Sequence, residues 1–242
     1  MSLHICILET DVLRPELVEA YQGYGRMFEQ LFANQPIAAK FSVYNVMQGE
    51  YPADDLTFDA YLVTGSKADS FGSDPWIATL KTYLLKRYER GDKLLGICFG
   101  HQLLALLLGG RAERASQGWG VGIHDYAVAR HEPWMTPEVD SLTLLISHQD
   151  QVTALPSDAQ VVASSEFCPF AAYQIGNQVL CFQGHPEFVS EYSRALLDLR
   201  QQQLGEPIYR NAVASLEREH HGRAVGEWML RFVAQPTTSP NA

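Results

Sequence analysis

A cysteine stands between two glycines in the stretch Gly96-Ile-Cys98-Phe-Gly100, and an apolar run from 103 to 108 follows it. Residues 94–97 are also apolar and predict a buried strand, so the cysteine falls at a strand-to-helix turn. Glycines two residues before and after are typical of the tight turn that lifts a nucleophile above a sheet. At the start of a helix, unpaired N–H groups and the helix dipole favour a thiolate. The pattern predicts a nucleophile, although a lone cysteine among apolar residues is more often a packing residue.

A histidine and a glutamate follow a second apolar run, at residues 179–182. A thiol nucleophile needs a base that takes its proton and later returns one to the leaving group. The base in turn needs a group that fixes its tautomer. The segment His185-Pro-Glu187 supplies both. Because parallel strands end at a common edge of their sheet, we expect Cys98, His185 and Glu187 to meet there as a catalytic triad.

Strand-like and helix-like segments alternate along the first hundred residues. This alternation predicts an α/β protein with a flavodoxin-like open, mostly parallel sheet and helices on both faces. Ligands of such folds bind outside the carboxyl ends of the strands, where Cys98 and His185 are expected. The expected strands are 3–8, 41–46, 59–63 and 94–97, and the expected helices are 16–32 and 76–90.

The second half of the chain has a different texture. Short alternating runs with frequent turns between residues 118 and 175 predict an antiparallel section added to the main sheet. The last helical pattern carries Val225, Trp228, Met229 and Phe232 at helical spacing and is expected to pack on the core. We interpret residues 1–235 as one catalytic domain and residues 236–242 as a polar tail.

Composition narrows the class of protein. The 242 residues are 46% hydrophobic and carry a net charge of −10, which argues against a general nucleic-acid or membrane-surface binder. The four cysteines have neither metal-site spacing nor disulfide-framework density, which favours a reducing compartment. The apolar run at 3–8 is too short for a signal peptide, and no run is long enough to span a membrane. The expected location is the cytoplasm.

Four segments together resemble the class I, or triad, glutamine amidotransferases. Gly-Ile-Cys98-Phe-Gly-His-Gln102 and Gly-His185-Pro-Glu187 carry most of the resemblance. Val63-Thr-Gly-Ser-Lys67 stands where that family has its Gly-rich oxyanion loop, and the segment from Ser147 to Val152 resembles a stretch of GMP synthases. The sequence is most similar to the amidotransferase domain of GMP synthase and its free-standing homologues, from about residue 5 to 189.

The resemblance implies further roles around the nucleophile. A tetrahedral intermediate needs oxyanion donors, one of which is the N–H of Phe99, the residue after the nucleophile. The family loop implies a second donor at Gly65 or Ser66, and the sequence does not choose between them. Ser66 and Lys67 depart from the Gly and Pro that are usual there. The resemblance also implies three substrate-binding positions: Gln102, Gly118 and Trp119.

The resemblance also implies an activity. The expected enzyme is a glutaminase-type hydrolase that releases ammonia from glutamine through a cysteinyl γ-glutamyl thioester. The ammonia would serve a separate synthetase subunit, because the residues outside the family match are too few for a synthetase domain. A stand-alone γ-glutamyl peptidase or hydrolase is the alternative, and an inactive regulatory homologue is a third. We expect no cofactor and no metal, and neither nucleic acid nor membrane as a partner. The sequence does not reveal the oligomeric state.

Overall fold

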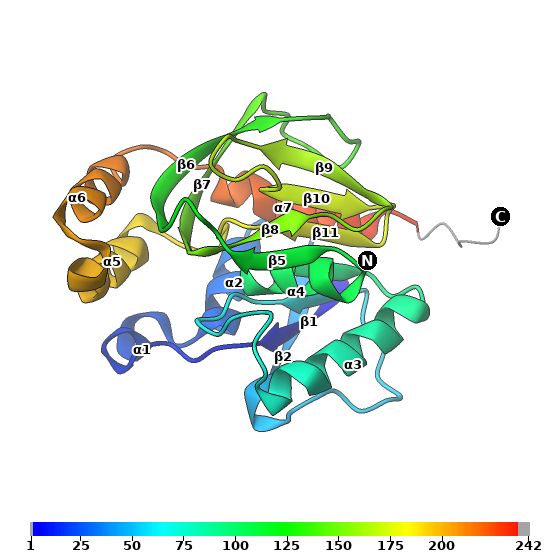
Figure 1. Ribbon diagram of the computed structural model, residues 1–242. Helices are drawn as coiled ribbons and strands as arrows, with labels where there is room; N and C mark the ends of the chain where they lie inside the picture. The colour runs from blue at the N-terminus through cyan, green and yellow to red at the C-terminus, as the bar shows by residue number, and fades with distance from the viewer. Residues whose placement is uncertain (1, 237–242) are drawn as a thin grey trace.

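The apolar run at the start of the chain forms an inner strand of a large sheet. The computed structural model describes residues 2–236, and within them the chain forms a nine-stranded sheet in the order β2-β1-β3-β4-β11-β10-β9-β6-β7 (Figure 1). Its first five strands pair in parallel, in the strand order of a flavodoxin-like fold, which confirms the predicted fold class. These strands are β1 (Leu3–Glu9), β2 (Ala39–Asn45), β3 (Ala60–Val63), β4 (Leu94–Ile97) and β11 (Val179–Phe182).

Helices cover both faces of the parallel half. On β1, Ile5 and Ile7 pack on one side while Cys6 and Leu8 pack on the other, as expected for a strand buried on both faces. The first side is covered by α2 (Tyr24–Phe32) and α7 (Gly222–Ala234). The second is covered by α3 (Pro75–Glu89) and α4 (Phe99–Leu107). The expected helix at 76–90 and the expected core contacts of the last helix are confirmed.

The antiparallel section joins the sheet beside β11, as predicted, with one correction. Its strands are β10 (Ala172–Ile175), β9 (Ala159–Ser164), β6 (Gly120–Val128) and β7 (Ser141–His148). The strand β8 (Asp150–Ala154) lies in the same stretch of sequence but leaves the main sheet. It pairs instead with β5 (Arg111–Arg114), a strand that the sequence did not predict. Ala112 and Val152 from this small sheet pack in the same apolar cluster as α4.

The single helix expected at 16–32 is wrong, because the chain breaks there into α1 (Pro15–Tyr21) and α2. Gln22 ends α1 in the left-handed region, with a φ of 63°. The Glu9 carboxylate then accepts a hydrogen bond of 2.6 Å from the N–H of Gly25 in the first turn of α2. Pinning the start of α2 to the end of β1 gives this helix a direction that α1 does not share.

Two helices between the triad region and α7 were not predicted. They are α5 (Ser190–Leu204) and α6 (Glu206–Ser215), and they project together from one side of the molecule (Figure 1). A short 3₁₀ turn, η1 (Val46–Gln48), follows β2. None of the described helices has the length and apolar character needed to cross a bilayer. The expected polar tail, apart from Pro236, lies outside the described residues.

The two glycines on either side of Cys98 lie where the backbone leaves no room for a side chain. A Cβ added to Gly100 would lie 2.4 Å from the carbonyl oxygen of Val63, and one added to Gly96 would lie 2.7 Å from the carbonyl of Gly100. Both neighbours are backbone atoms of packed elements. The two glycines that bracket Cys98 are therefore required by the close approach of β3, β4 and α4.

Replacing Gly100 with Ala should lower the free energy of unfolding by about 1–3 kcal/mol, because an overpacked core site must shift backbone to relieve the clash. Urea denaturation measures this change. Ala78→Ser, on the exposed side of α3, is the control and should change stability by less than about 0.5 kcal/mol. Equal stabilities for the parent and Gly100→Ala would contradict the packing argument.

Candidate active site

Cys98 occupies the strand-to-helix turn with a backbone that few non-glycine residues adopt. Its φ is 51° and its ψ is −99°, and α4 begins at the next residue. The N–H of Cys98 donates to the carbonyl of Phe182 on β11 at 2.9 Å, and the N–H of Gly100 donates to the carbonyl of Thr64 at 3.3 Å. The turn is therefore held by strands on both sides. Strain that the surrounding structure maintains in this way often occurs at functional sites.

His185 and Glu187 follow the end of β11 and contact each other directly. Nδ1 of His185 donates to Oε1 of Glu187 at 2.8 Å, and both residues are 4% exposed. The imidazole stacks on the ring of Phe188, with centroids 3.9 Å apart. The N–H of His185 donates to the carbonyl of Leu145 on β7 at 2.8 Å. Because Nδ1 is engaged by the carboxylate, Nε2 is the ring nitrogen left for another partner.

Cys98 and His185 meet at Gly65. A Cβ built on Gly65 would lie 2.7 Å from Cε1 of His185 and 3.5 Å from Cβ of Cys98. The absence of a side chain at position 65 thus lets the imidazole approach the cysteine. The two side chains are close enough for Cys98 to act on the charge of the His185 imidazole. The three residues expected to converge at one edge of the sheet do converge there.

The charges around His185 favour its protonated form. Burial alone would lower the pKa of this imidazole, but the Glu187 carboxylate and the neighbouring Cys98 outweigh burial and raise the pKa to about 10. An imidazole in this state carries a proton at neutral pH. The geometry therefore supplies a proton donor next to a sulfur, with a carboxylate fixing its orientation.

A polar pocket of about 350 Å³ opens at Cys98. Gln102 and Trp119, two of the residues expected to bind substrate, line it. Nε2 of Gln102 donates to the carbonyl of Asp150 at 2.9 Å and to Oε1 of Gln183 at 3.1 Å, which fixes the amide. Gly118, the third expected residue, is half-buried next to Trp119 and is not among the residues that line the pocket.

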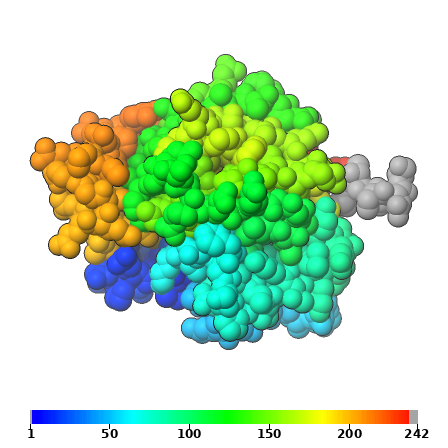
Figure 2. Space-filling model, viewed as in Figure 1, coloured from blue at the N-terminus to red at the C-terminus, as the bar shows by residue number. Residues whose placement is uncertain are grey.

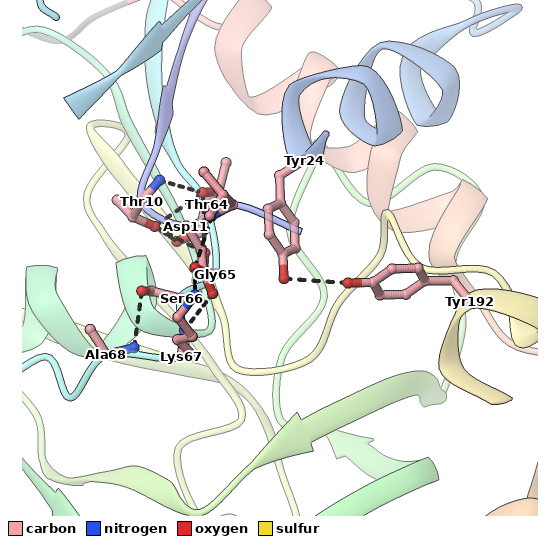
Figure 3. A network of polar contacts seen from close by, with 10 residues as sticks. Thr10, Asp11, Tyr24, Thr64, Gly65, Ser66, Lys67, Ala68 and Tyr192 are labelled. Atoms are coloured by element: carbon pink, nitrogen blue, oxygen red, sulfur yellow. Dashed lines mark hydrogen bonds and ion pairs between the residues drawn. The ribbon is translucent and has the colours of Figure 1, made fainter. Parts of the chain in front are cut away.

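The expected oxyanion loop is held by Thr10 and Asp11, the two residues that follow β1 (Figure 3). Oγ1 of Thr10 donates to the carbonyls of Thr64 and Gly65 within a tight cluster of 3.0 Å contacts. With its carbonyl held on that side, the peptide after Gly65 is fixed in orientation. Ser66 lines the pocket, and Phe99 is the first residue of α4, where an N–H has no acceptor within the helix.

The carboxylate of Asp11 holds both the backbone and the side chain of Lys67 in the same loop (Figure 3). One carboxylate oxygen of Asp11 accepts from the N–H of Lys67 at 2.9 Å, and the other lies 2.9 Å from Nζ of Lys67. The Asp11 side chain is 5% exposed. The clamp stands where the related family has a proline, so this chain stiffens the loop with a buried carboxylate that holds the backbone and the exposed ammonium of Lys67. No motif in the sequence pointed to Asp11.

Charged side chains that the sequence analysis did not assign also line the pocket. Arg114 bridges two carboxylates, with Nε 2.6 Å from Asp150 and Nη2 3.2 Å from Asp69. Burial and the adjacent Asp69 raise the pKa of Asp150 to about 6 despite the guanidinium. Arg14 and Arg200 line the pocket as well. No sequence pattern marks Arg14 or Arg200, because the first lies in a loop before α1 and the second on α5, a helix that the sequence did not predict.

Residues 2–236 contain no cluster of three or more His, Cys, Asp or Glu side chains arranged to hold a metal ion. The pocket offers amides, hydroxyls and charged groups as its binding atoms. These groups suit a small polar organic molecule with both positive and negative charges.

A flavodoxin-like sheet that carries a cysteine at a strand-to-helix turn, with a histidine and a carboxylate beside it, is an arrangement suited to a cysteine hydrolase. The chain belongs to the glutamine amidotransferase class-I family, whose model matches residues 40–198. The resemblance seen in the sequence is thereby confirmed.

Individual relatives place the chain within that family. It is 33% identical over 188 residues to γ-glutamyl peptidase 3 of Arabidopsis thaliana, covering 74% of this chain and 75% of that protein. It is 38% identical over 111 residues to the glutamine-hydrolyzing GMP synthase of Citrobacter koseri, covering 41% of this chain and 21% of the synthase. A crystal structure of a glutamine amidotransferase from Thermotoga maritima superposes with a TM-score of 0.78 at 18% identity, covering 97% and 100% of the two chains. This last likeness bears on the fold.

Replacing Asp11 with Ala should lower the free energy of unfolding by about 1–3 kcal/mol, because it leaves the N–H of Lys67 without its acceptor. Urea denaturation followed by circular dichroism tests this. Lys67→Met removes only the ion pair of an exposed ammonium and should cost less than about 1 kcal/mol. A larger loss for Lys67→Met than for Asp11→Ala would contradict the assignment of the backbone hydrogen bond as the main contact.

Proposed function

We propose that this protein hydrolyses γ-glutamyl amides through a cysteinyl thioester, with Cys98, His185 and Glu187 as the catalytic triad. The observation that carries the proposal is the position of His185, which lies between Cys98 and the Glu187 carboxylate, with Cys98 itself lining a polar pocket. A nucleophile, a proton carrier and an orienting group in contact are the parts that covalent acyl transfer needs.

The first half of the reaction forms the thioester. The sulfur of Cys98, as a thiolate, attacks the γ-carbonyl carbon of the substrate and gives a tetrahedral oxyanion. The carbon–nitrogen bond then breaks while His185 donates its proton to the departing nitrogen, which leaves as ammonia or an amine. The raised pKa of His185 supports this step, because the imidazole holds the required proton at neutral pH.

The second half regenerates the enzyme. Neutral His185 takes a proton from water as the oxygen attacks the thioester, and the carbon–sulfur bond breaks to release glutamate and the thiolate. In both halves the oxyanion accepts hydrogen bonds from the N–H of Phe99 and from an amide of the Gly65–Ser66 turn. Thr10 and Asp11 support this assignment, since they fix that turn before substrate arrives.

Substrate positioning is assigned to Gln102 and Trp119. The Nε2 group of Gln102 is already bonded to Asp150 and Gln183, so Oε1 is its atom available to accept from the substrate. Trp119 supplies an apolar wall for the aliphatic part of a γ-glutamyl group. The backbone at Gly118, which the family resemblance also suggested, sits beside the pocket and can contribute only at its rim.

Two substrates fit the mechanism. The similarity to γ-glutamyl peptidase 3 over three quarters of that protein favours a stand-alone hydrolase of γ-glutamyl peptides. The similarity to GMP synthase favours the second candidate, a glutaminase that passes ammonia to a synthetase subunit. The complete set of Cys98, His185 and Glu187 weighs against an inactive regulatory homologue.

The cysteine chemistry also supports a reducing location. Cys6, Cys98, Cys168 and Cys181 are all buried and unpaired with one another. A thiol nucleophile must stay reduced to act, and the other three cysteines form no disulfide bond with one another. We infer a cytoplasmic enzyme.

Cys98→Ala should abolish amide hydrolysis without unfolding the protein, because it removes only the attacking sulfur. The assay measures ammonia from glutamine and glycine from γ-glutamylglycine. Cys6→Ala, a buried cysteine on β1, is the matched control and should keep the parent rate. In parallel, 6-diazo-5-oxonorleucine should add once to the parent, by intact mass, and not to Cys98→Ala. Release of products by Cys98→Ala at the parent rate would show that another group is the nucleophile.

Glu187→Gln should change the pH dependence as well as the rate. A general acid must be protonated, so activity of the parent should fall only as the pH rises through about 10, the raised pKa of His185. Removing the Glu187 charge leaves burial opposed by Cys98 alone, which lowers the pKa of His185 and moves the alkaline limb to lower pH. We expect kcat to drop by about 100-fold or more. A profile of kcat/KM against pH with an unmoved alkaline limb would contradict the role of Glu187.

A further inference from the structure

Arg200 is a half-buried cation on the wall of the pocket that contains Cys98. It comes from α5. Its Nη1 donates to Oγ of Ser147 at 2.5 Å, and its guanidinium carbon lies 5.3 Å from the centre of the Trp119 ring. A hydroxyl and an aromatic face orient this side chain, but neither neutralises its charge.

Arg14 stands next to it on a neighbouring element. It immediately precedes α1, and it lines the same pocket. The two elements pack through an apolar cluster that contains Leu17 of α1 and Leu196 of α5. In Figure 2 the blue N-terminal segment and the gold helical segment lie side by side. Burial lowers the pKa of Arg200, and Arg14 lowers it further, so the two guanidiniums act on each other.

These two cations differ from the others around the pocket. Lys67 is paired with Asp11, and Arg114 is paired with Asp69 and Asp150. Within residues 2–236, by contrast, no carboxylate forms an ion pair with Arg14 or Arg200. Arg200 is half-buried without a carboxylate partner, which is uncommon because removing the charge of an arginine from water is costly, whereas Arg14 is exposed beside it. A guanidinium pair left open toward a pocket therefore points to an anionic ligand.

We propose that Arg14 and Arg200 form a carboxylate-binding subsite of the substrate pocket, an inference that rests on the proposed γ-glutamyl hydrolase function. Guanidinium groups match the planar geometry of a carboxylate and bind it through paired hydrogen bonds. A γ-glutamyl peptide offers two such groups: the α-carboxylate of its glutamyl part and the terminal carboxylate of its leaving group. Glutamine offers only the first.

The sequence positions of the two arginines separate this subsite from the catalytic residues. The family model matches residues 40–198, and both Arg14 and Arg200 lie outside that stretch. The triad and Gln102 lie inside it. The subsite would therefore select the substrate without altering the chemistry at Cys98.

Calorimetric binding to Cys98→Ala protein tests the subsite without turnover. The ligands are L-glutamine, γ-glutamylglycine and γ-glutamylmethylamide, the last having an α-carboxylate but no carboxylate on its leaving group. Arg14→Ala and Arg200→Ala are compared with Arg194→Ala, a matched control on α5 whose exposed guanidinium pairs with Asp198. Arg14 lies in an exposed segment, so its variant should fold even if Arg200→Ala does not; thermal melting checks both.

We expect each pocket substitution to weaken binding by about 10- to 100-fold, the effect of losing a charge-assisted hydrogen bond. Loss confined to γ-glutamylglycine places the leaving-group carboxylate in the subsite. Equal loss for all three ligands places the α-carboxylate there. Binding that neither Arg14→Ala nor Arg200→Ala weakens more than Arg194→Ala overturns the subsite. If Cys98→Ala protein with both arginines binds none of the ligands, the proposed function itself fails, and the subsite with it.

Discussion

Two backbone hydrogen bonds at the cysteine turn hold the rest of the site in register. The N–H of Cys98 binds the carbonyl of Phe182, and the N–H of Gly100 binds the carbonyl of Thr64. The chain that leaves β11 at Phe182 leads directly to His185, and the chain that leaves β3 at Val63 leads through Thr64 to Gly65. The same contacts that maintain the strained turn therefore set the position of the proposed base and of the proposed oxyanion loop. A residue held at positive φ costs of order 1–3 kcal/mol, which the surrounding packing must offset.

The parts of the site that belong to the sheet could be predicted from the sequence. Strand β4 is a short apolar run bounded by turn residues, and Gly96 and Gly100 mark the close approach of backbones around Cys98. His185 follows an equally apolar strand. Since the carboxyl ends of parallel strands share an edge, two such strands are enough to place the side chains that follow them near each other. Local pattern and global topology agree at these positions.

The parts that depend on contacts between distant loops and helices could not be predicted. Asp11 accepts a hydrogen bond from the N–H of Lys67 and pairs with its ammonium group, and neither contact has a sequence signature. Arg200 lies on a polar helix whose few apolar positions did not predict a helix. The break between α1 and α2 arises because the Glu9 carboxylate captures the N–H of Gly25, a tertiary contact that overrides helical periodicity. The departure of β8 from the main sheet likewise depends on its pairing with β5.

The bond from His185 to Leu145 links one end of the large sheet to its middle. Leu145 lies on β7, the outermost strand of the antiparallel section, whereas His185 follows β11 in the middle of the sheet order. The antiparallel half must curl back on itself for this bridge to form. The backbone of the proposed base is thus anchored to the antiparallel half of the sheet, whereas the cysteine turn is anchored to β11 and to the residue after β3 in the parallel half. A substitution that loosens the join between the two halves would accordingly slow catalysis from a distance, by separating the imidazole from the sulfur.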